Sequence, residues 1–129
     1  MQPTELSPTW LNIHYEDQGR FALVHASGEC DLTNAGQLIR ALEQAAELSP
    51  FVVLDLAGLT YLDSSGISVL LQVWKALRAR SGVLVIVACR PPVTRVVHVV
   101  GLNHLMPIVG TIEEAIARLA SSSPTGASA

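Results

Sequence analysis

Two short and almost uninterrupted apolar runs constrain the fold of this chain more than any other feature. They are FVVLDL, residues 51–56, and VLVIVA, residues 83–88. Runs of this kind are typical of strands that are covered on both faces, as in parallel sheets. The segment between them has an apolar face at helical spacing, formed by Ile67, Leu70, Leu71, Trp74 and Leu77. A strand, a crossover helix and a second strand predict parallel pairing in an α/β domain.

The N-terminal part of the chain adds a hairpin and a helix to this pattern. Polar and apolar residues alternate over residues 10–15, and Glu16-Asp17-Gln18-Gly19 supplies turn residues. A second strand is predicted over residues 21–25, ending at Ser27-Gly28. Thr33-Asn34 is a favourable start for a helix, which should stop near Ser49-Pro50. The opening hairpin makes the predicted sheet mixed rather than purely parallel.

The C-terminal part continues the alternation of helices and strands. Pro91-Pro92 opens a helix that Gly101 is placed to end, and residues 106–109 predict a short strand. Thr111 and Glu114 then form a capping box at the start of a last helix. The predicted fold is therefore α/β, a small mixed sheet of four to five strands with an N-terminal hairpin and about four helices.

Composition bounds the class of protein. The 129 residues are 50% hydrophobic and 15% charged, which favours one folded domain, predicted over residues 9–120, with a disordered tail over residues 121–129. The net charge is −3 and no basic run stands out, so no nucleic-acid partner is expected. The longest apolar stretch is too short to span a membrane, and the N-terminus does not resemble a secretory signal. We therefore expect a cytoplasmic protein without a membrane partner.

The stretch YLDSSGISVLL, residues 61–71, is the most informative candidate site. It places Ser64 and Ser65 between a predicted strand and a helix, at the carboxyl edge of the sheet, where functional loops gather. One interpretation is structural: Asp63, Ser64 or Ser65 caps the helix and Gly66 eases the turn. Another is that the helix start accommodates an added anion.

Catalytic and metal-binding interpretations have less support in the sequence. A nucleophile elbow needs a glycine two residues before the serine, and Leu62 or Asp63 stands there. No histidine is tied to the serines by spacing, no phosphate-binding loop is present, and no paired-histidine or CxxC metal spacing occurs. We therefore expect no enzymatic activity, no metal and no cofactor.

Beyond these local patterns, the chain resembles the STAS domain of bacterial anti-sigma factor antagonists. The resemblance lies in VVLDLAGLTYLDSSGISVLLQVWKALRARSG and the following VLVIVACRPPVTRVVHVVGL. It extends back to SGECDLTNAGQL and forward to IVGTIEEAIARL, and so covers roughly residues 10 to 120. Its most specific element is Asp63-Ser64-Ser65-Gly66 between the strand and the apolar helix.

The resemblance implies a STAS fold and a phosphorylation switch on Ser64. In such proteins the partner is both an anti-sigma factor and an ATP-dependent serine kinase. The unphosphorylated domain binds that partner and frees a sigma factor, phosphorylation breaks the complex, and a metal-dependent serine/threonine phosphatase resets it. The alternative is a STAS adaptor subunit of a transport or signalling assembly that is not phosphorylated.

The partner-binding edge is expected to include Asp31, Asp63, Ser65 and Gly66 around the phosphoacceptor. A phosphate adds about −1.5 to −2 charges beside these residues. Weakening a complex a hundredfold requires only about 2.7 kcal/mol. One buried and unmatched phosphate would be enough to supply that difference.

The helix after the serines has a wider apolar arc than a core stripe requires. Val69 and Val73 extend this arc beside the core positions. Two interpretations stay open: a helix broadly buried against the sheet, or a surface on which Val69 and Val73 contact the partner.

The two cysteines, Cys30 and Cys89, each follow a predicted strand. If those strands flank the central one, the cysteine Cα atoms lie roughly 9–10 Å apart. That separation exceeds the reach of a disulfide, so free thiols are expected.

Overall fold

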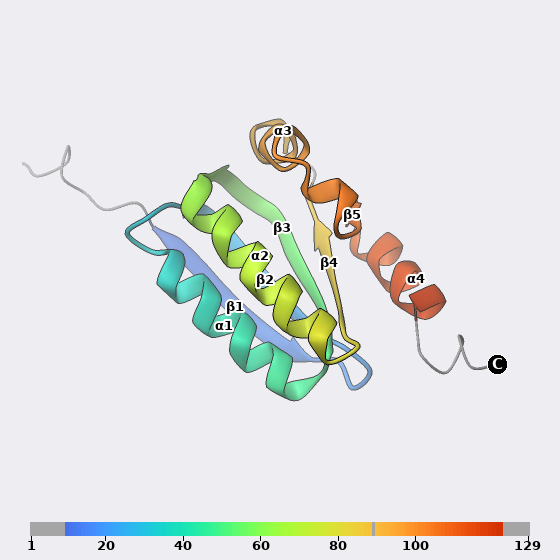
Figure 1. Cartoon of the computed structure of the whole chain (residues 1–129). Coiled ribbons are helices and arrows are strands. Elements are labelled where there is room, and N and C mark those ends of the chain that lie inside the picture. Colours follow the sequence, from blue (N-terminus) through green and yellow to red (C-terminus); the bar gives the residue numbers. More distant parts are fainter. Residues whose placement is uncertain (1–9, 89, 123–129) are drawn as a thin grey trace, which may run out of the picture.

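A computed structural model of the chain describes residues 10–88 and 90–122. Its centre is a five-stranded sheet whose strands follow chain order, β1-β2-β3-β4-β5 (Figure 1). β1 and β2 are antiparallel, and every later pair is parallel. The elements are β1 (Leu11–Asp17), β2 (Ala22–Cys30), α1 (Ala35–Leu48), β3 (Phe51–Leu62), α2 (Ser64–Ala79), β4 (Val83–Val87), α3 (Pro91–Val99), the 3-10 helix η2 (Leu102–His104), β5 (Ile108–Val109) and α4 (Ile112–Ser122). The predicted mixed sheet with an N-terminal hairpin and four helices is confirmed.

The two faces of the sheet are covered differently. Residues of α1, α2 and α3 share one buried cluster with Leu54 and Leu56 of β3, which puts these connecting helices on one face. Figure 1 shows α1 and α2 side by side along that face. α4 packs on the other face, where Ala115 and Leu119 join Val53 and Val85. Successive parallel strands with right-handed crossovers require this one-sided placement of the connecting helices.

The hairpin pairs β1 with β2 along its whole length, from Leu11 opposite Gly28 to Asp17 opposite Ala22. Its turn is closed by the Gln18 N–H, which donates to the Phe21 carbonyl at 2.9 Å. Gly19 has a φ of 84°, which glycine adopts without strain, and its N–H donates to Asp17 Oδ1 at 2.8 Å. Gln18 and Gly19 of the predicted turn therefore do lie in the turn, whereas Glu16 and Asp17 are the last paired residues of β1.

β2 and β3 are longer than the sequence predicts. β3 continues past residue 56 to Leu62, and β2 continues through Ser27-Gly28 to Cys30. The two strands stay paired because their register shifts twice, between His25 and Ser27 and between Gly28 and Glu29. Gly58 lies so close to Ser27 that a Cβ there would stand 2.8 Å from the Ser27 Cβ. The glycines mark bulges and close backbone approach rather than strand ends.

The last third of the chain departs slightly from prediction. Thr111 and Glu114 form the expected capping box: the Glu114 N–H donates to Thr111 Oγ1, and the Thr111 N–H to Glu114 Oε1, each at 3.1 Å. The predicted strand over residues 106–109 is only Ile108–Val109, because the Met106 N–H closes a turn onto the Leu102 carbonyl. α4 continues to Ser122, so the first two residues of the predicted tail are helical, and residues 123–129 lie outside the described part. Within the described part, no helix has the length and apolar character needed to cross a membrane.

Candidate functional site

The candidate site lies where β2 and β3 end side by side. Cys30 and Leu62, the last residues of the two strands, are partners in the parallel register. Each is followed by an aspartate, Asp31 or Asp63. The Asp63 N–H donates to the Cys30 carbonyl at 3.3 Å and joins the two chain segments beyond the last register pair. The expectation that Asp31 lies on the same edge as Ser64 is therefore correct.

Asp63 caps α2 and leaves the adjacent serine exposed. Its backbone is extended, with φ −108° and ψ −170°, and its Oδ1 accepts the Ser65 N–H at 2.9 Å. This is the capping geometry that satisfies one of the free N–H groups at a helix start. Ser64 is the first helical residue and is exposed to solvent. Among the described residues, its hydroxyl has no hydrogen-bond partner.

The segment between β2 and α1 is held by its own side chains. Asp31 Oδ1 accepts the Thr33 N–H at 2.9 Å and the Thr33 hydroxyl at 2.6 Å. Asn34 is 4% exposed and stands at the N-cap position of α1, but its side chain makes no cap bond. Its Oδ1 accepts the Asp31 N–H and its Nδ2 donates to the Glu29 carbonyl, both at 2.9 Å. Asn34, which the sequence indicated only as a cap, therefore anchors this segment.

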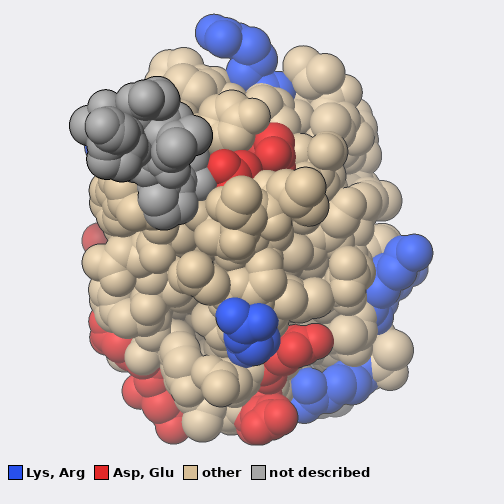
Figure 2. Space-filling model, turned by 90° about the vertical axis from the view of Figure 1, so that its left-hand side faces the viewer, with Lys and Arg blue, Asp and Glu red and all other residues tan. Residues whose placement is uncertain are grey.

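An open hollow beside Asp63 brings acidic and apolar groups together. Its lining residues are Glu29, Asp31, Leu32, Thr33, Tyr61 and Asp63. Leu32 is 80% exposed and Tyr61 48% exposed, which is high for large side chains next to a folded edge. Figure 2 looks onto the side of the molecule that is at the left in Figure 1, and shows a small acidic patch within a largely uncharged area. The combination offers a protein partner both an apolar anchor and a negative charge.

Sequence reasoning missed Glu29, Leu32 and Tyr61 as members of this edge. Tyr61 belongs to the part of β3 that the sequence did not predict as strand. Leu32 directly follows Asp31, and an exposed leucine between two polar residues carries no pattern that marks it. Only the parallel register of β2 and β3 brings these residues to one place.

Gly66 is part of the packing behind the site rather than of its surface. It is buried, and a Cβ at this position would stand 2.3 Å from Leu62 Cδ1 and 3.0 Å from Cys30 Sγ. The lack of a side chain lets α2 approach the ends of β2 and β3 closely. Gly66, which the sequence included in the partner-binding edge, therefore shapes that edge from behind.

Val69 and Val73 are buried, which corrects the hypothesis that they form part of a partner-binding surface. They are 5% and 4% exposed and belong to the same core cluster as Leu38 and Leu42 of α1. The wide apolar arc of α2 exists because this helix packs against both the sheet and α1. The other interpretation of the sequence, a broadly buried helix, is the one the structure confirms.

Cys30 is a buried thiol between the two aspartates. Burial, and after it the negative charges of Asp63 and Asp31, raise the pKa of Cys30 from an ordinary 9.0 to about 11. Each of these effects disfavours the charged thiolate. The thiol is therefore protonated and unreactive at neutral pH.

The predicted separation of Cys30 and Cys89 is not tested, because Cys89 lies outside the described residues. The premise of that prediction holds, since β2 and β4 flank β3 in the sheet. Within residues 10–88 and 90–122, the one group of side chains arranged like metal ligands lies away from this edge, on the β1–β2 hairpin.

Comparison with known proteins identifies the family. A family model described as STAS domain matches residues 12–115, so the chain belongs to the STAS domain family. The anti-sigma F factor antagonist of Paenibacillus polymyxa is 29% identical over 111 residues, which is 84% of this chain and 95% of that protein.

Solved structures show the same fold. An anti-sigma factor antagonist from Mycobacterium paratuberculosis has a TM-score of 0.80 and 28% identity, and the match covers 86% of this chain and 95% of that one. The anti-sigma factor antagonist SpoIIAA in its unphosphorylated form has a TM-score of 0.68 and 26% identity, covering 85% and 97% of the two chains. The predicted STAS fold is thereby confirmed.

Proposed function

We propose that this chain is an anti-sigma factor antagonist that is switched by phosphorylation of Ser64. Its unphosphorylated form binds an anti-sigma factor that is also a serine kinase, and this binding releases a sigma factor. Membership of the STAS family and similarity to proteins named anti-sigma factor antagonists over most of their length support the proposal. The structure of SpoIIAA, which has the same fold, is named as that of its unphosphorylated form. This name distinguishes two phosphorylation states of that protein, and we propose that this chain also has two.

The observation that favours Ser64 as the phosphoacceptor is that the cap at the start of α2 is made by Asp63 and the Ser65 N–H, without the Ser64 hydroxyl. Asp63 makes the cap through Ser65, so the Ser64 hydroxyl is exposed and engaged by no other described residue. Phosphorylation of this hydroxyl by a kinase therefore breaks no hydrogen bond within the described part of the domain. The first helical position also has free N–H groups and a partial positive charge, which tolerate a phosphate without unfolding the helix.

The surroundings of Ser64 explain how a phosphate would switch binding. The edge already has three carboxylates, those of Glu29, Asp31 and Asp63, close to exposed Leu32 and Tyr61. A partner that covers this surface needs an apolar pocket and cationic or N–H groups matched to a fixed negative charge. A phosphate adds about −1.5 to −2 charges in the middle of that contact. A hundredfold loss of affinity for the partner corresponds to a binding free energy that is weaker by about 2.7 kcal/mol.

In this account the chain has no catalytic activity of its own. The kinase activity belongs to the anti-sigma factor, and a metal-dependent serine/threonine phosphatase removes the phosphate from Ser64. We propose that Asp31, Asp63 and Ser65, which the sequence indicates, contact the partner. Leu32 and Tyr61, which line the same hollow as the two aspartates, contact it as well. Such a cycle acts on transcription and places the protein in the cytoplasm.

The proposal is tested by capturing partners from extracts of the native cells with the chain as bait. Wild-type chain and Ser64→Ala are expected to retain a protein that has both a serine-kinase ATP site and sigma-factor binding, identified by mass spectrometry. Ser64→Glu is expected to lose most of it. Leu32→Ala should weaken capture without changing phosphorylation of the free chain by the purified partner at saturating concentration.

Ser68→Ala is the control, because it removes an exposed hydroxyl of the same helix that is not among the proposed contact residues. It should behave as wild type. If instead the bait captures the subunits of a transport or signalling assembly, and Ser64→Glu captures them equally, the chain is the adaptor and the phosphorylation switch is wrong.

A further inference from the structure

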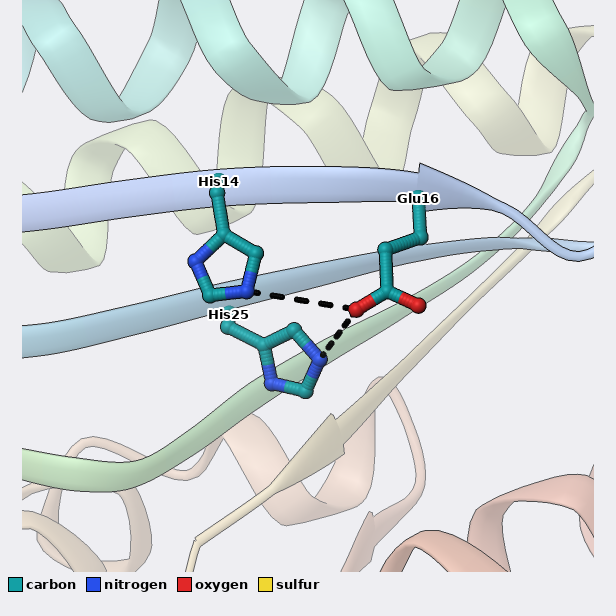
Figure 3. Close-up of side chains that lie close together, drawn as sticks. All are labelled: His14, Glu16 and His25. Carbon is teal, nitrogen blue, oxygen red and sulfur yellow. Dashed lines mark ion pairs between the residues drawn. The ribbon is translucent and has the colours of Figure 1, made fainter.

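Three side chains of the β1–β2 hairpin converge on the face of the sheet that points away from α1 and α2. They are His14 and Glu16 of β1 and His25 of β2 (Figure 3). His14 is the direct register partner of His25, and Glu16 stands two residues along β1 on the same face as His14. Their placement therefore follows from the hairpin register and not from a chance meeting of flexible loops.

The distances between their donor atoms are short. Glu16 Oε2 lies 3.4 Å from His25 Nε2 and 3.9 Å from His14 Nε2. One possible ligand atom from each residue lies within 4.8 Å of the other two. The two imidazole rings are stacked, with centroids 4.7 Å apart and an interplanar angle of 25°.

Asp55 of β3 fixes the orientation of His25 from behind. His25 Nδ1 lies 2.9 Å from Asp55 Oδ2. An ionised carboxylate only accepts hydrogen bonds, so Nδ1 holds the proton and, in the neutral ring, Nε2 has a lone pair. That lone pair then faces a Glu16 oxygen at 3.4 Å, an arrangement that a cation between the two atoms would stabilise. A carboxylate behind a histidine ligand is the usual outer shell of a metal site.

The exposure of these groups is graded from the surface inward. The side chains of His14 and Glu16 are 63% and 47% exposed, that of His25 is 26% exposed and that of Asp55 14% exposed. An ion therefore has a direct path from solvent to the three ligand atoms, whereas the supporting carboxylate is largely shielded.

We propose that His14, Glu16 and His25 bind one divalent transition-metal ion, best matched by Zn²⁺, with a solvent molecule completing the tetrahedron. Two imidazole nitrogens and one carboxylate oxygen form a frequent zinc ligand set. Metal–ligand distances of about 2.0–2.2 Å put tetrahedral donor atoms roughly 3.3–3.6 Å apart. The pair at 3.4 Å already matches. The exposed His14 ring, stacked on His25 in the metal-free chain, has to rotate out of this stack before its Nε2 lone pair points at the same ion.

Such an ion would tie the edge strand β1 to β2. It is independent of the proposed switch, because its ligands lie along the hairpin and not at the ends of β2 and β3. No metal site was expected from the sequence, because His14 and His25 do not stand at the short spacing of a paired-histidine motif. His14 and His25 are brought together only by the pairing of the two strands.

The test is a titration of the untagged, metal-stripped full chain with zinc chloride, followed by calorimetry. One equivalent of zinc per chain is expected, and the chain loaded with Co²⁺ should show the intense visible absorption of a tetrahedral site. His14→Ala and His25→Ala should each weaken zinc binding at least tenfold. Because His14 is mostly exposed, its alanine variant stays folded and keeps the test interpretable if His25→Ala does not fold.

Asp55→Asn tests the supporting carboxylate and should weaken zinc binding about tenfold to a hundredfold. His104→Ala is the matched control, since it removes another exposed histidine outside the hairpin and should leave the affinity unchanged. The proposal is overturned if wild-type chain shows no saturable binding of zinc. It is equally overturned if the His14→Ala and His104→Ala variants bind zinc alike.

Discussion

The helices α1 and α2 begin next to each other, and an aspartate and a hydroxyl residue stand near the start of each. The hydrogen bonds at the two helix starts nevertheless differ. Both follow an aspartate at the end of a strand, and the two strands end as register partners. Before α1, the Asp31 N–H donates a hydrogen bond to the Asn34 side chain, and the Thr33 hydroxyl donates one to the Asp31 carboxylate. Before α2, Asp63 alone makes the cap.

This difference shows why only one of the two helix starts is suited to a reversible modification. A phosphate on Thr33 would break its hydrogen bond to Asp31 and put a second anion against that carboxylate. A phosphate on Ser64 displaces no interaction within the described residues. The chemistry of an aspartate, a hydroxyl and a helix start is common to both, and the hydrogen-bond partners decide which hydroxyl stays available.

The two helices also differ in how closely they approach their neighbours, and alanine at their early glycines should reveal it. Gly66→Ala should lower the free energy of unfolding by about 1–3 kcal/mol, because the new Cβ meets Leu62 and Cys30. Gly36→Ala in α1 meets only the end of the flexible Arg40 side chain and should raise it by about 0.5 kcal/mol. Denaturant unfolding of both variants measures the contrast, and equal effects would show that α2 packs no more tightly than α1.

Asn34 and Asp63, the residues at the two N-cap positions, should differ in their effect on stability, although asparagine and aspartate cap helices about equally well. Asn34→Ala removes the two part-buried hydrogen bonds that the Asn34 side chain makes with the Asp31 N–H and the Glu29 carbonyl, and should cost about 2 kcal/mol. Asp63→Ala removes one cap bond and should cost about 1 kcal/mol. Chemical denaturation of the two variants provides the comparison. A larger loss for Asp63→Ala would mean that the α1 segment is not held by Asn34.

The buried thiol between the two helix starts predicts a dependence of stability on pH. Well below pH 9 the folded and unfolded chains both keep the Cys30 proton, so the ionisation of this thiol does not make the unfolding free energy depend on pH. Because the folded pKa is about 11 against 9.0 for an ordinary thiol, the unfolded chain loses its proton first as the pH rises. Stability therefore falls between pH 9 and 11, by about 1 kcal/mol at pH 10.

This effect is measured as the difference between the chain with Cys30 and its Cys30→Ala variant, both with Cys89→Ser. The gap in unfolding free energy should narrow from about pH 8 to about pH 10. A gap that stays constant over this range would contradict the raised pKa.

The smallest contrast concerns the two hydroxyls. Thr33→Ala removes the hydroxyl bonded to Asp31 at 2.6 Å and should cost about 0.5–1 kcal/mol. Ser64→Ala should change the unfolding free energy by less than about 0.5 kcal/mol, since it removes an exposed and unengaged group. Thermal unfolding of the pair is sufficient. A substantial loss in Ser64→Ala would mean that this serine has a structural role.

The sequence predicted the parts of the molecule that depend on local pattern. The alternation of strands and helices, the turn at Gly19 and the capping box at Thr111 follow from residue spacing, and they are confirmed. The position of Ser64 at a helix start was predictable for the same reason. Residues 57–62 of β3 were missed because their pairing with β2 needs two register shifts that no local pattern indicates.

The parts that sequence could not supply depend on contacts between distant segments. Val69 and Val73 belong to the core because α1 packs beside α2, which the apolar arc of one helix does not determine. Leu32 and Tyr61 meet only through the register of β2 and β3, and His14 meets His25 only through the hairpin. Side-chain pairing across strands is therefore where the structure adds most to the sequence.

The central claim is that Ser64 is the phosphoacceptor, and the most direct test is phosphopeptide mass spectrometry of the chain isolated from its native cells with phosphatases inhibited. The account predicts one phosphate, located on Ser64, absent from the Ser64→Ala chain and present in Ser65→Ala. A phosphate on Ser65 instead, or unmodified chain under every growth and stress condition, would contradict it.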